Sequence, residues 1–132
     1  MDPIATLQES TPNGFHDGSL YELRIDYSGR RMVLDVGLDM SEGGGARRAK
    51  ERRCKIVIMG LEFVIIESVE GFSRSKGEDG VMIDVGPLEG ERLRRVWKRD
   101  APSDGFVYWM FVSESDGCIY FCGRDGLFEW SD

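Results

Sequence analysis

Regular alternation between apolar and polar residues from position 21 to position 40 constrains the fold of this chain more than any other feature. In Tyr21–Tyr27 the odd positions are apolar or aromatic and the even positions are charged, and in Arg31–Met40 the even positions are apolar. Because successive side chains of a strand point to opposite faces, the pattern predicts two strands, each with a buried face and a solvated face. Ser28–Arg30 joins them and supplies the glycine that a tight hairpin favours. We therefore expect an antiparallel hairpin over these residues.

Further strand-like segments, separated by turn residues, follow this hairpin. They are Cys54–Met59, Leu61–Val69, Val81–Val85, Phe106–Ser113, Cys118–Cys122 and Leu127–Trp130. Leu61–Val69 has apolar residues in both phases, which predicts a strand near the middle of the fold. Asp-Gly pairs at positions 116–117 and 125–126 are typical of hairpin turns, so we expect the last three segments to form a meander.

The remaining segments are polar or ambiguous. Ser41–Arg53 contains consecutive glycines and a basic cluster, so we expect a mobile loop or a loop with one frayed helical turn. Gly71–Gly80 is polar, and we expect a loop there as well. Within Leu88–Arg99 the apolar residues fit the spacing of a short helix, and an edge strand is the alternative.

Together these elements predict a mainly β fold, an antiparallel β-sandwich or a partly open barrel of about seven or eight short strands with at most one short helix. A chain of 132 residues is most simply one domain, which we expect to span residues 1–132. Residues 1–12 precede the first strand pattern, and we expect them to form a flexible N-terminal arm. The side chains predicted to be buried are Leu23, Ile25, Leu34, Val36, Ile56, Phe63, Val107 and Phe121.

Targeting signals and cysteines bear on where the chain works. The N-terminus has no basic start followed by an apolar stretch, and the apolar runs fall far short of the roughly 20 residues that span a bilayer. We therefore expect a cytoplasmic protein that does not enter a membrane. The chain has three cysteines, an odd number, and Cys118 and Cys122 would lie about 13 Å apart along one strand. We expect no intrachain disulfide.

The charge of the chain argues against nucleic acid as a partner. The net charge is −7, so the surface as a whole repels a phosphate backbone. Basic residues cluster in Ala46–Lys55 and in Arg92–Arg99, where Trp97 adds an aromatic side chain, but no recognised binding module accompanies them. We interpret the clusters as solvated faces or protected sheet edges and do not expect nucleic-acid binding.

Motifs for catalysis or metal binding are sparse. The chain has one histidine and lacks the close ligand pair of a zinc site, a nucleophile elbow, a phosphate-binding loop and a dinucleotide fingerprint. Cys54 stands between Arg53 and Lys55, whose side chains would point to the face of the strand opposite the thiol. We therefore assign no catalytic residue, no metal site and no cofactor, and a protein that is not an enzyme is the favoured interpretation.

His16 and Asp17 form the one local arrangement that suggests a site. They lie between Gly14 and Gly18, immediately before the first predicted strand. In the structural interpretation Asp17 accepts backbone hydrogen bonds in a turn, while His16 packs and donates to a carbonyl. In the functional interpretation the pair contacts a ligand or a partner. Consecutive side chains seldom bond each other well, so the structural role is preferred.

The segment Asn13–Leu20, NGFHDGSL, followed by an alternating hairpin, resembles the start of several small uncharacterised bacterial domain families whose openings read Asn-x-x-His-Asp-x-x-Leu. Val57–Phe63 (VIMGLEF) and Ile119–Trp130 (IYFCGRDGLFEW) are similar to the middle and terminal strand patterns of such domains. Some related families are grouped with immunity proteins of polymorphic toxin systems. The resemblance implies a non-enzymatic β-domain and supplies no catalytic residues.

Two functional hypotheses remain open. In the first, the chain is a protein-binding module, and more specifically an immunity-type inhibitor that meets a basic toxin through an acidic surface with aromatic anchors. The aromatic candidates are Tyr108, Trp109, Tyr120 and Trp130. In the second, the chain is a small-molecule-binding barrel or a small enzyme with a site at His16, Asp17 or Cys54.

We assign four residues to binding, namely His16, Asp17, Trp109 and Trp130. A shallow acidic face with exposed aromatic side chains would favour the first hypothesis. A deep polar pocket at His16 would favour the second.

Overall fold

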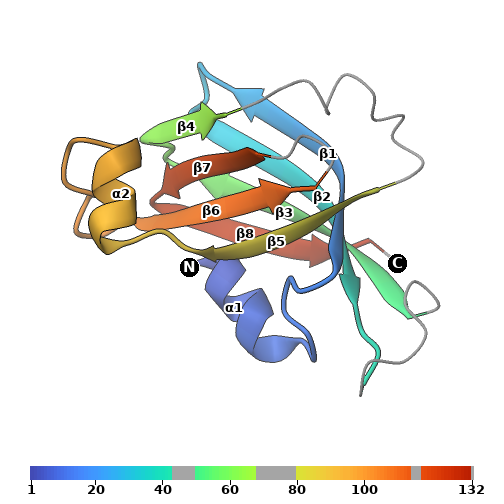
Figure 1. Ribbon diagram of the computed structural model, residues 1–132. Coiled ribbons are helices and arrows are strands. Elements are labelled where there is room, and N and C mark those ends of the chain that lie inside the picture. Colours follow the sequence, from blue (N-terminus) through green and yellow to red (C-terminus); the bar gives the residue numbers. More distant parts are fainter. Residues whose placement is uncertain (43–49, 68–79, 114–116, 132) are drawn as a thin grey trace.

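The computed structural model describes residues 1–42, 50–67, 80–113 and 117–131. These residues form a single antiparallel sheet of eight strands together with two short helices (Figure 1). The strands are β1 (Gly18–Asp26), β2 (Arg31–Asp39), β3 (Glu51–Met59), β4 (Phe63–Ile66), β5 (Val81–Pro87), β6 (Phe106–Val112), β7 (Gly117–Gly123) and β8 (Asp125–Trp130), and the helices are α1 (Pro3–Ser10) and α2 (Gly90–Val96). The predicted mainly β, antiparallel fold is confirmed, but the limit of one helix is wrong.

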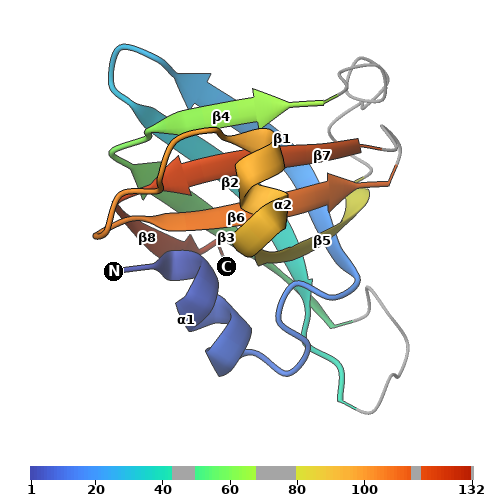
Figure 2. The ribbon, with the colours of Figure 1, turned by 60° about the vertical axis from the view of Figure 1, so that its left-hand side comes forward.

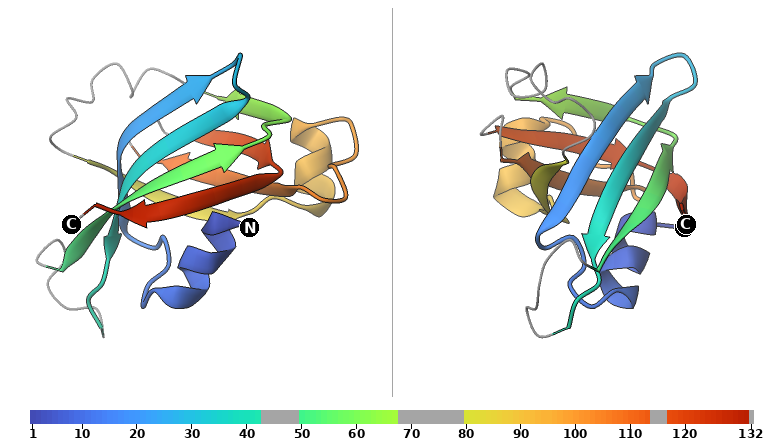
Figure 3. Two further views of the ribbon diagram at one scale, coloured as in Figure 1. Left: turned by 180° about the vertical axis from the view of Figure 1, so that it is seen from behind. Right: turned by 90° about the vertical axis from the view of Figure 1, so that its right-hand side faces the viewer.

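The sheet is folded over on itself into two layers. Its strands follow the order β4-β7-β6-β5-β1-β2-β3-β8, and β1 meets β5 through the short pairing of Gly18–Leu20. Here the sheet turns, so that β4, β7, β6 and β5 form one layer and β1, β2, β3 and β8 form the other (Figures 2 and 3). The fold is thus a sandwich made from one continuous sheet. The main core fills the space between the layers, with Leu34, Ile56, Met110 and Phe121 among its buried side chains.

The alternating pattern of β1 and β2 produces the predicted hairpin, with one change of phase. Leu23 pairs with Leu34 on the core side. A bulge between Leu20 and Glu22 shifts the register, because one extra residue is inserted into β1. Tyr21 therefore leaves the face of Leu23, and its ring lies 3.6 Å from the guanidinium carbon of Arg53.

Helix α2 lies across the outer face of the β4-β7-β6-β5 layer (Figure 2). It covers a second, smaller core that contains Phe63, Leu88, Cys118, Tyr120 and Cys122. The helix predicted within Leu88–Arg99 is confirmed. β4 is covered on both faces because α2 lies on one side and the main core on the other, yet it is an end strand of the sheet. The prediction of a central position for this segment is therefore wrong.

The predicted core is confirmed for most of its members. Leu34, Val36, Ile56, Phe63 and Phe121 are buried. Leu23, Ile25 and Val107 are only half-buried. Val107 packs against the smaller core, because β6 turns Tyr108 and Met110 towards the space between the layers.

Residues 1–12 do not form the expected flexible arm. The carboxylate of Asp2 accepts hydrogen bonds from the backbone N–H groups of Ile4 and Ala5 at 3.0 and 3.1 Å, which caps α1. Ile4 and Leu7, one turn apart, are buried in the main core. The hydroxyl of Tyr108 donates to Asp2 at 2.5 Å. Helix α1 therefore covers one open side of the sandwich (Figure 1).

The last three strands do not form a simple meander. β6 and β7 pair as expected, but β8 crosses to the other layer and pairs with β3. The backbone N–H of Arg124 donates to the carbonyl of Met59 at 3.0 Å, so the chain leaves β7 towards the end of β3. Gly126 belongs to β8, where an added Cβ would lie 2.6 Å from the carbonyl oxygen of Val57. The Asp-Gly pair at 125–126 therefore reflects close packing of strands and not a hairpin turn.

The loop predictions lie partly outside the described residues. Positions 43–49, 68–79, 114–116 and 132 are not described, and they include most of the two predicted loops and Asp116 of the predicted Asp-Gly turn. The predicted loop Ser41–Arg53 is too long, since β3 begins at Glu51. The three cysteines are all free and buried, which confirms the absence of an intrachain disulfide.

Candidate functional site

A groove of about 350 Å³ lies between the β1–β2 turn and β4. These two elements lie on the side of the sandwich opposite α1 (Figure 1). The end of β1 and the turn that follows it form one wall, and the β3–β4 connection and β4 form the other. The apolar side chains that line it include Ile25, Tyr27, Leu61, Phe63, Val64 and Trp97. We call this feature the hairpin groove.

The β1–β2 turn is fixed to the β3–β4 connection. The backbone N–H of Leu61 donates to the carbonyl of Arg30, and Nε of Arg30 donates to the carbonyl of Leu61, both at 3.0 Å. Within the turn, Asp26 accepts a hydrogen bond from the N–H of Gly29 at 3.0 Å. This bond is the main reason why the pKa of Asp26 lies below its ordinary value. The two walls of the groove are thus held at a defined separation.

Charged groups at the rim of the groove are paired with one another. Glu62 accepts a hydrogen bond from Arg124 at 2.6 Å and lies 3.4 Å from Arg30. The bond from Arg124 is the main cause that lowers the pKa of Glu62. Asp26 lies 3.8 Å from Arg31 across the start of β2. The lining of the groove is therefore mainly apolar, and the charged groups at its rim are paired.

Two aromatic side chains flank the groove. Tyr27, at the end of the hairpin, is 83% exposed. Trp97, which follows α2, stacks on Phe63 with ring centroids 4.3 Å apart and an angle of 22° between the ring planes. Large aromatic groups beside an apolar hollow are typical anchors of protein interfaces. The groove is therefore suited to apolar or aromatic side chains.

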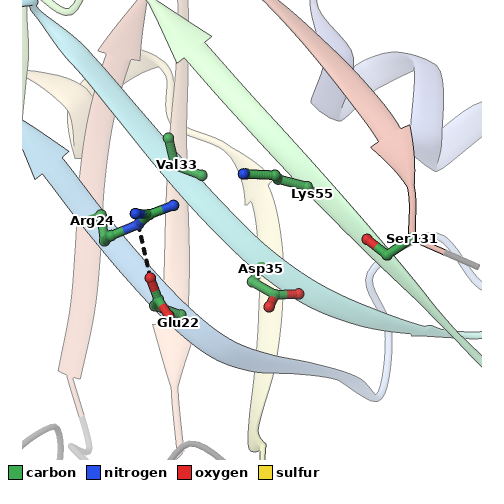
Figure 4. A pocket seen from close by; sticks show the side chains of 6 residues that line it. All are labelled: Glu22, Arg24, Val33, Asp35, Lys55 and Ser131. Atoms are coloured by element: carbon green, nitrogen blue, oxygen red, sulfur yellow. Dashed lines mark ion pairs between the residues drawn. The ribbon is translucent and has the colours of Figure 1, made fainter.

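A second hollow, of about 260 Å³, lies on the outer face of β1, β2 and β3 and is charged (Figure 4). Arg24 and Lys55 extend towards each other across Val33, with Glu22 and Asp35 beside them. Nε of Arg24 lies 2.7 Å from the carboxylate of Glu22. Charges of both signs alternate across neighbouring strands, as on an ordinary solvated face of an antiparallel sheet.

Trp109 and Trp130 do not form a common aromatic surface. Trp109 is half-buried against the smaller core, with the guanidinium carbon of Arg92 at 5.0 Å from its ring. Trp130 belongs to the other layer and packs against the main core, with Arg52 at 4.2 Å from its ring. The other two aromatic candidates, Tyr108 and Tyr120, are buried. The aromatic face suggested by the sequence is therefore not assembled.

His16 and Asp17 lie beside a hollow of about 150 Å³. The imidazole of His16 is 76% exposed, with Nε2 at 3.6 Å from the Asp17 carboxylate, so the predicted packing of His16 is wrong. The backbone here does form a turn. The N–H of His16 donates to the carbonyl of Asn13 and that of Gly18 donates to the carbonyl of Phe15, both at 2.9 Å. Asp17 itself has a φ of 59°, in the left-handed region.

Asn13 and Phe15 fix this turn more than His16 does. The side-chain amide of Asn13 donates to the carbonyls of Asp39 and Ser41 at 3.0 and 2.7 Å. Phe15 is buried in the main core. The segment Asn13–Leu20 thus ties α1 to the end of β2.

Neither a reactive thiol nor a metal cluster is found in the described part of the chain. Burial raises the pKa of the Cys54 thiol to about 11, so the thiol is protonated at neutral pH. Among residues 1–42, 50–67, 80–113 and 117–131, no three His, Cys, Asp or Glu side chains are placed to hold a metal ion. No helix in these ranges has both the length and the apolar character needed to cross a membrane.

Sequence reasoning missed the two residues that flank the groove. The alternation assigns Tyr27 to the buried face of its strand, and Trp97 draws attention only through the basic cluster around it. The groove joins a hairpin end to segments that are distant in the sequence, so no local pattern indicates it. The one available signal is the position of Tyr27 directly before the turn, where neighbouring strands cannot cover a large side chain.

Comparison of the sequence with protein-family models found no match, and comparison with curated proteins found none either.

Proposed function

We propose that the protein is a non-enzymatic protein-binding module and that the hairpin groove contacts its partner. The proposal is carried by the side chain of Tyr27, which is 83% exposed beside an apolar groove of about 350 Å³. Covering such a group is favourable, and tyrosine and tryptophan are enriched among the residues that dominate binding energies. Trp97 is already oriented by its stacking on Phe63, which reduces the entropy lost when a partner binds.

In its more specific form, the proposal makes the partner a basic toxin that the protein inhibits. The net charge of −7 supports this form, because an acidic protein attracts a basic partner and speeds their encounter. The resemblance of Asn13–Leu20 to the openings of small bacterial domain families supports it as well, since some related families are grouped with immunity proteins. In this form of the proposal the groove makes the close contacts with the partner, and the net charge raises the rate of association.

The alternative of a small-molecule site at His16 and Asp17 has less support. The hollow beside them measures about 150 Å³, whereas small-molecule sites usually enclose about 300–1,000 Å³. The thiol of Cys54, with its pKa raised to about 11, is a poor nucleophile at neutral pH.

Three exposed apolar residues on three different surfaces allow a matched test. Tyr27 borders the groove, Met82 (45% exposed) borders the His16 hollow, and Leu127 (46% exposed) lies on β8. Each is replaced by serine, and the three variants and the wild type are used to capture proteins from an extract of the native host. The proposal predicts that Met82→Ser and Leu127→Ser capture the wild-type partner and that Tyr27→Ser does not.

The controls separate binding from folding. All three side chains are exposed, so the free energy of unfolding of each variant should lie within about 0.5 kcal/mol of the wild-type value. If only Met82→Ser fails to capture the partner, the binding site lies at the hollow beside His16 and not at the hairpin groove. Undiminished capture by Tyr27→Ser, or no capture by any form, would refute the proposal. For the specific form, the captured protein should be basic, and added salt should slow its association.

A further inference from the structure

The hairpin groove is bordered by the outer edge of an end strand. β4 is the outermost strand of its layer and pairs with β7 (Figure 2). The backbone N–H of Glu67, the residue after β4, donates to the carbonyl of Cys118 at 3.1 Å, so this pair continues the register of the β4–β7 ladder as a hydrogen-bonded pair. Such pairs alternate along antiparallel strands, so Ile65 also directs its backbone groups to β7. The N–H and C=O groups of Val64 and Ile66 therefore point away from β7.

Within the described residues, β4 has no charged residue and no proline to protect its outer edge, and its short length of four residues is the protection that it does have. End strands commonly contain lysine, proline, an inward charge or a bulge. β4 reads Phe-Val-Ile-Ile, and no other described strand pairs with its outer edge. The opposite end strand, β8, contains Asp125 and Glu129, and the ammonium of Met1 pairs with Asp125 at 2.6 Å. Of the two end strands in the described part of the chain, β4 is the one without charged residues, which favours strand addition there.

The groove also restricts which strand fits. Alternate side chains of a strand lying along β4 would enter the groove between Tyr27 and Trp97. The charges at the rim are already matched, since Glu62 is held by Arg124 and Arg30. A charged side chain entering there would be desolvated without a free counter-charge, which is costly. Uncharged apolar or aromatic side chains are therefore the complementary ones.

We propose that the groove takes up an extended segment of the partner protein, which pairs with β4 and presents uncharged apolar or aromatic side chains at alternate positions. This inference rests on the proposed function, because it specifies how the partner is held at the same groove. Backbone hydrogen bonds to Val64 and Ile66 supply affinity for an extended chain. The space between Tyr27 and Trp97 selects the side chains.

The probe is a displayed library of random peptides, each long enough to span a strand, selected against the full chain. The selected peptides should have apolar or aromatic residues at every second position and no net charge. They should bind Tyr27→Ser at least about tenfold more weakly than the wild type and bind Leu127→Ser unchanged.

Backbone methylation then tests strand pairing directly. A selected peptide is synthesised with N-methyl groups at every second position, in either of the two phases. Methylation of the N–H groups that face β4 should weaken binding at least about tenfold, whereas the other phase should bind as before. In amide exchange measured by NMR, the bound peptide should slow exchange at Val64 and Ile66, while Ile65 exchanges slowly already in the free protein.

Each contrary outcome has a distinct meaning. Equal binding of both methylated phases, or apolar residues at helical spacing in the selected peptides, would overturn strand addition and leave the groove as the contact site. Failure to select any binding peptide would overturn the inference in the same way. Undiminished binding to Tyr27→Ser would overturn the groove itself and with it the proposed function. If the wild type forms a dimer and Tyr27→Ser does not, the outer edge of β4 pairs with a second copy of the chain, and the inference is overturned.

Discussion

At Asp17 the chain requires a residue that accepts a left-handed backbone. Its φ of 59° is reached most easily by glycine and, among other residues, by asparagine and aspartate. His16 carries no comparable constraint, because its side chain is 76% exposed. The two adjacent residues that suggest a site in the sequence therefore differ in kind, one set by backbone geometry and the other free to vary.

We expect Asp17→Ala to lower the free energy of unfolding by about 0.5–2 kcal/mol, because alanine adopts a positive φ at a cost. Asp17→Gly should lose much less, since glycine adopts this conformation freely. His16→Ala should stay within about 0.5 kcal/mol of the wild type. Denaturant unfolding of the three variants checks these values. Equal losses in Asp17→Ala and Asp17→Gly would assign the role to the carboxylate and not to the backbone.

The thiols also test the fold at the scale of single residues. Burial is the main cause that raises the pKa of Cys54 and of Cys122 to about 11 and the pKa of Cys118 above its ordinary value. At about pH 8 a thiol reagent should react slowly with the native protein, because little thiolate is present. After denaturation without reductant it should find three groups. A single reactive group in a denatured monomer would reveal a disulfide that this structure lacks.

At the scale of elements, α1 shows how a short helix is held by its first residue. Asp2 accepts two backbone hydrogen bonds at the start of α1 and also receives the hydroxyl of Tyr108. Burial, followed by the bond to Asp2, raises the pKa of Tyr108 above its ordinary value. A helix of eight residues with few apolar positions has too little periodicity to be recognised in the sequence.

Asp2→Ala should therefore lower the free energy of unfolding by about 1–2 kcal/mol, through loss of the cap and of the contact with Tyr108. Asp2→Asn keeps an acceptor for the helix N–H groups and should lose less. Thermal or denaturant unfolding distinguishes the two. If Asp2→Ala unfolded like the wild type, residues 1–12 would be the flexible arm that their sequence suggests.

The β3–β4 connection should show a characteristic pH dependence. Arg124 is the main cause that lowers the pKa of Glu62 from its ordinary value of 4.5. A lowered pKa in the folded state means that the ionised carboxylate stabilises the fold above the unfolded pKa, and that this contribution is lost as the pH falls through the folded pKa. Glu62→Gln should thus be less stable than the wild type at neutral pH, and the difference should shrink below about pH 4.5. A constant difference over this range would show that the ion pair does not contribute.

At the scale of the whole molecule, local patterns predict the strands but not all of their partners. The β1–β2 hairpin follows from alternation on either side of a short turn, so neighbouring residues suffice to predict it. The pairing of β8 with β3 joins segments that are distant in the sequence. The Asp-Gly pair that contains Gly126 predicts a turn, but close packing against Val57 explains the glycine. The sequence of β4 resembles that of a central strand, with apolar residues on both faces, because α2 covers its second face. The hairpin groove results from these long-range pairings, which is why Tyr27 and Trp97 do not stand out in the sequence.

The same long-range arrangement leaves the two open sides of the sandwich in different states. Helix α1 fills one of them with buried side chains. On the other side the hairpin and β4 leave a groove, and the large aromatic side chain of Tyr27 beside it is exposed. We propose that a protein partner occupies this second side.

Calorimetric titration of the captured partner into the wild type, Tyr27→Ser and Leu127→Ser measures whether the groove holds the partner. We expect a Kd at least about tenfold higher for Tyr27→Ser, equivalent to about 1.4 kcal/mol, and a Kd within about twofold of the wild type for Leu127→Ser. The same Kd for Tyr27→Ser and the wild type would contradict the proposal.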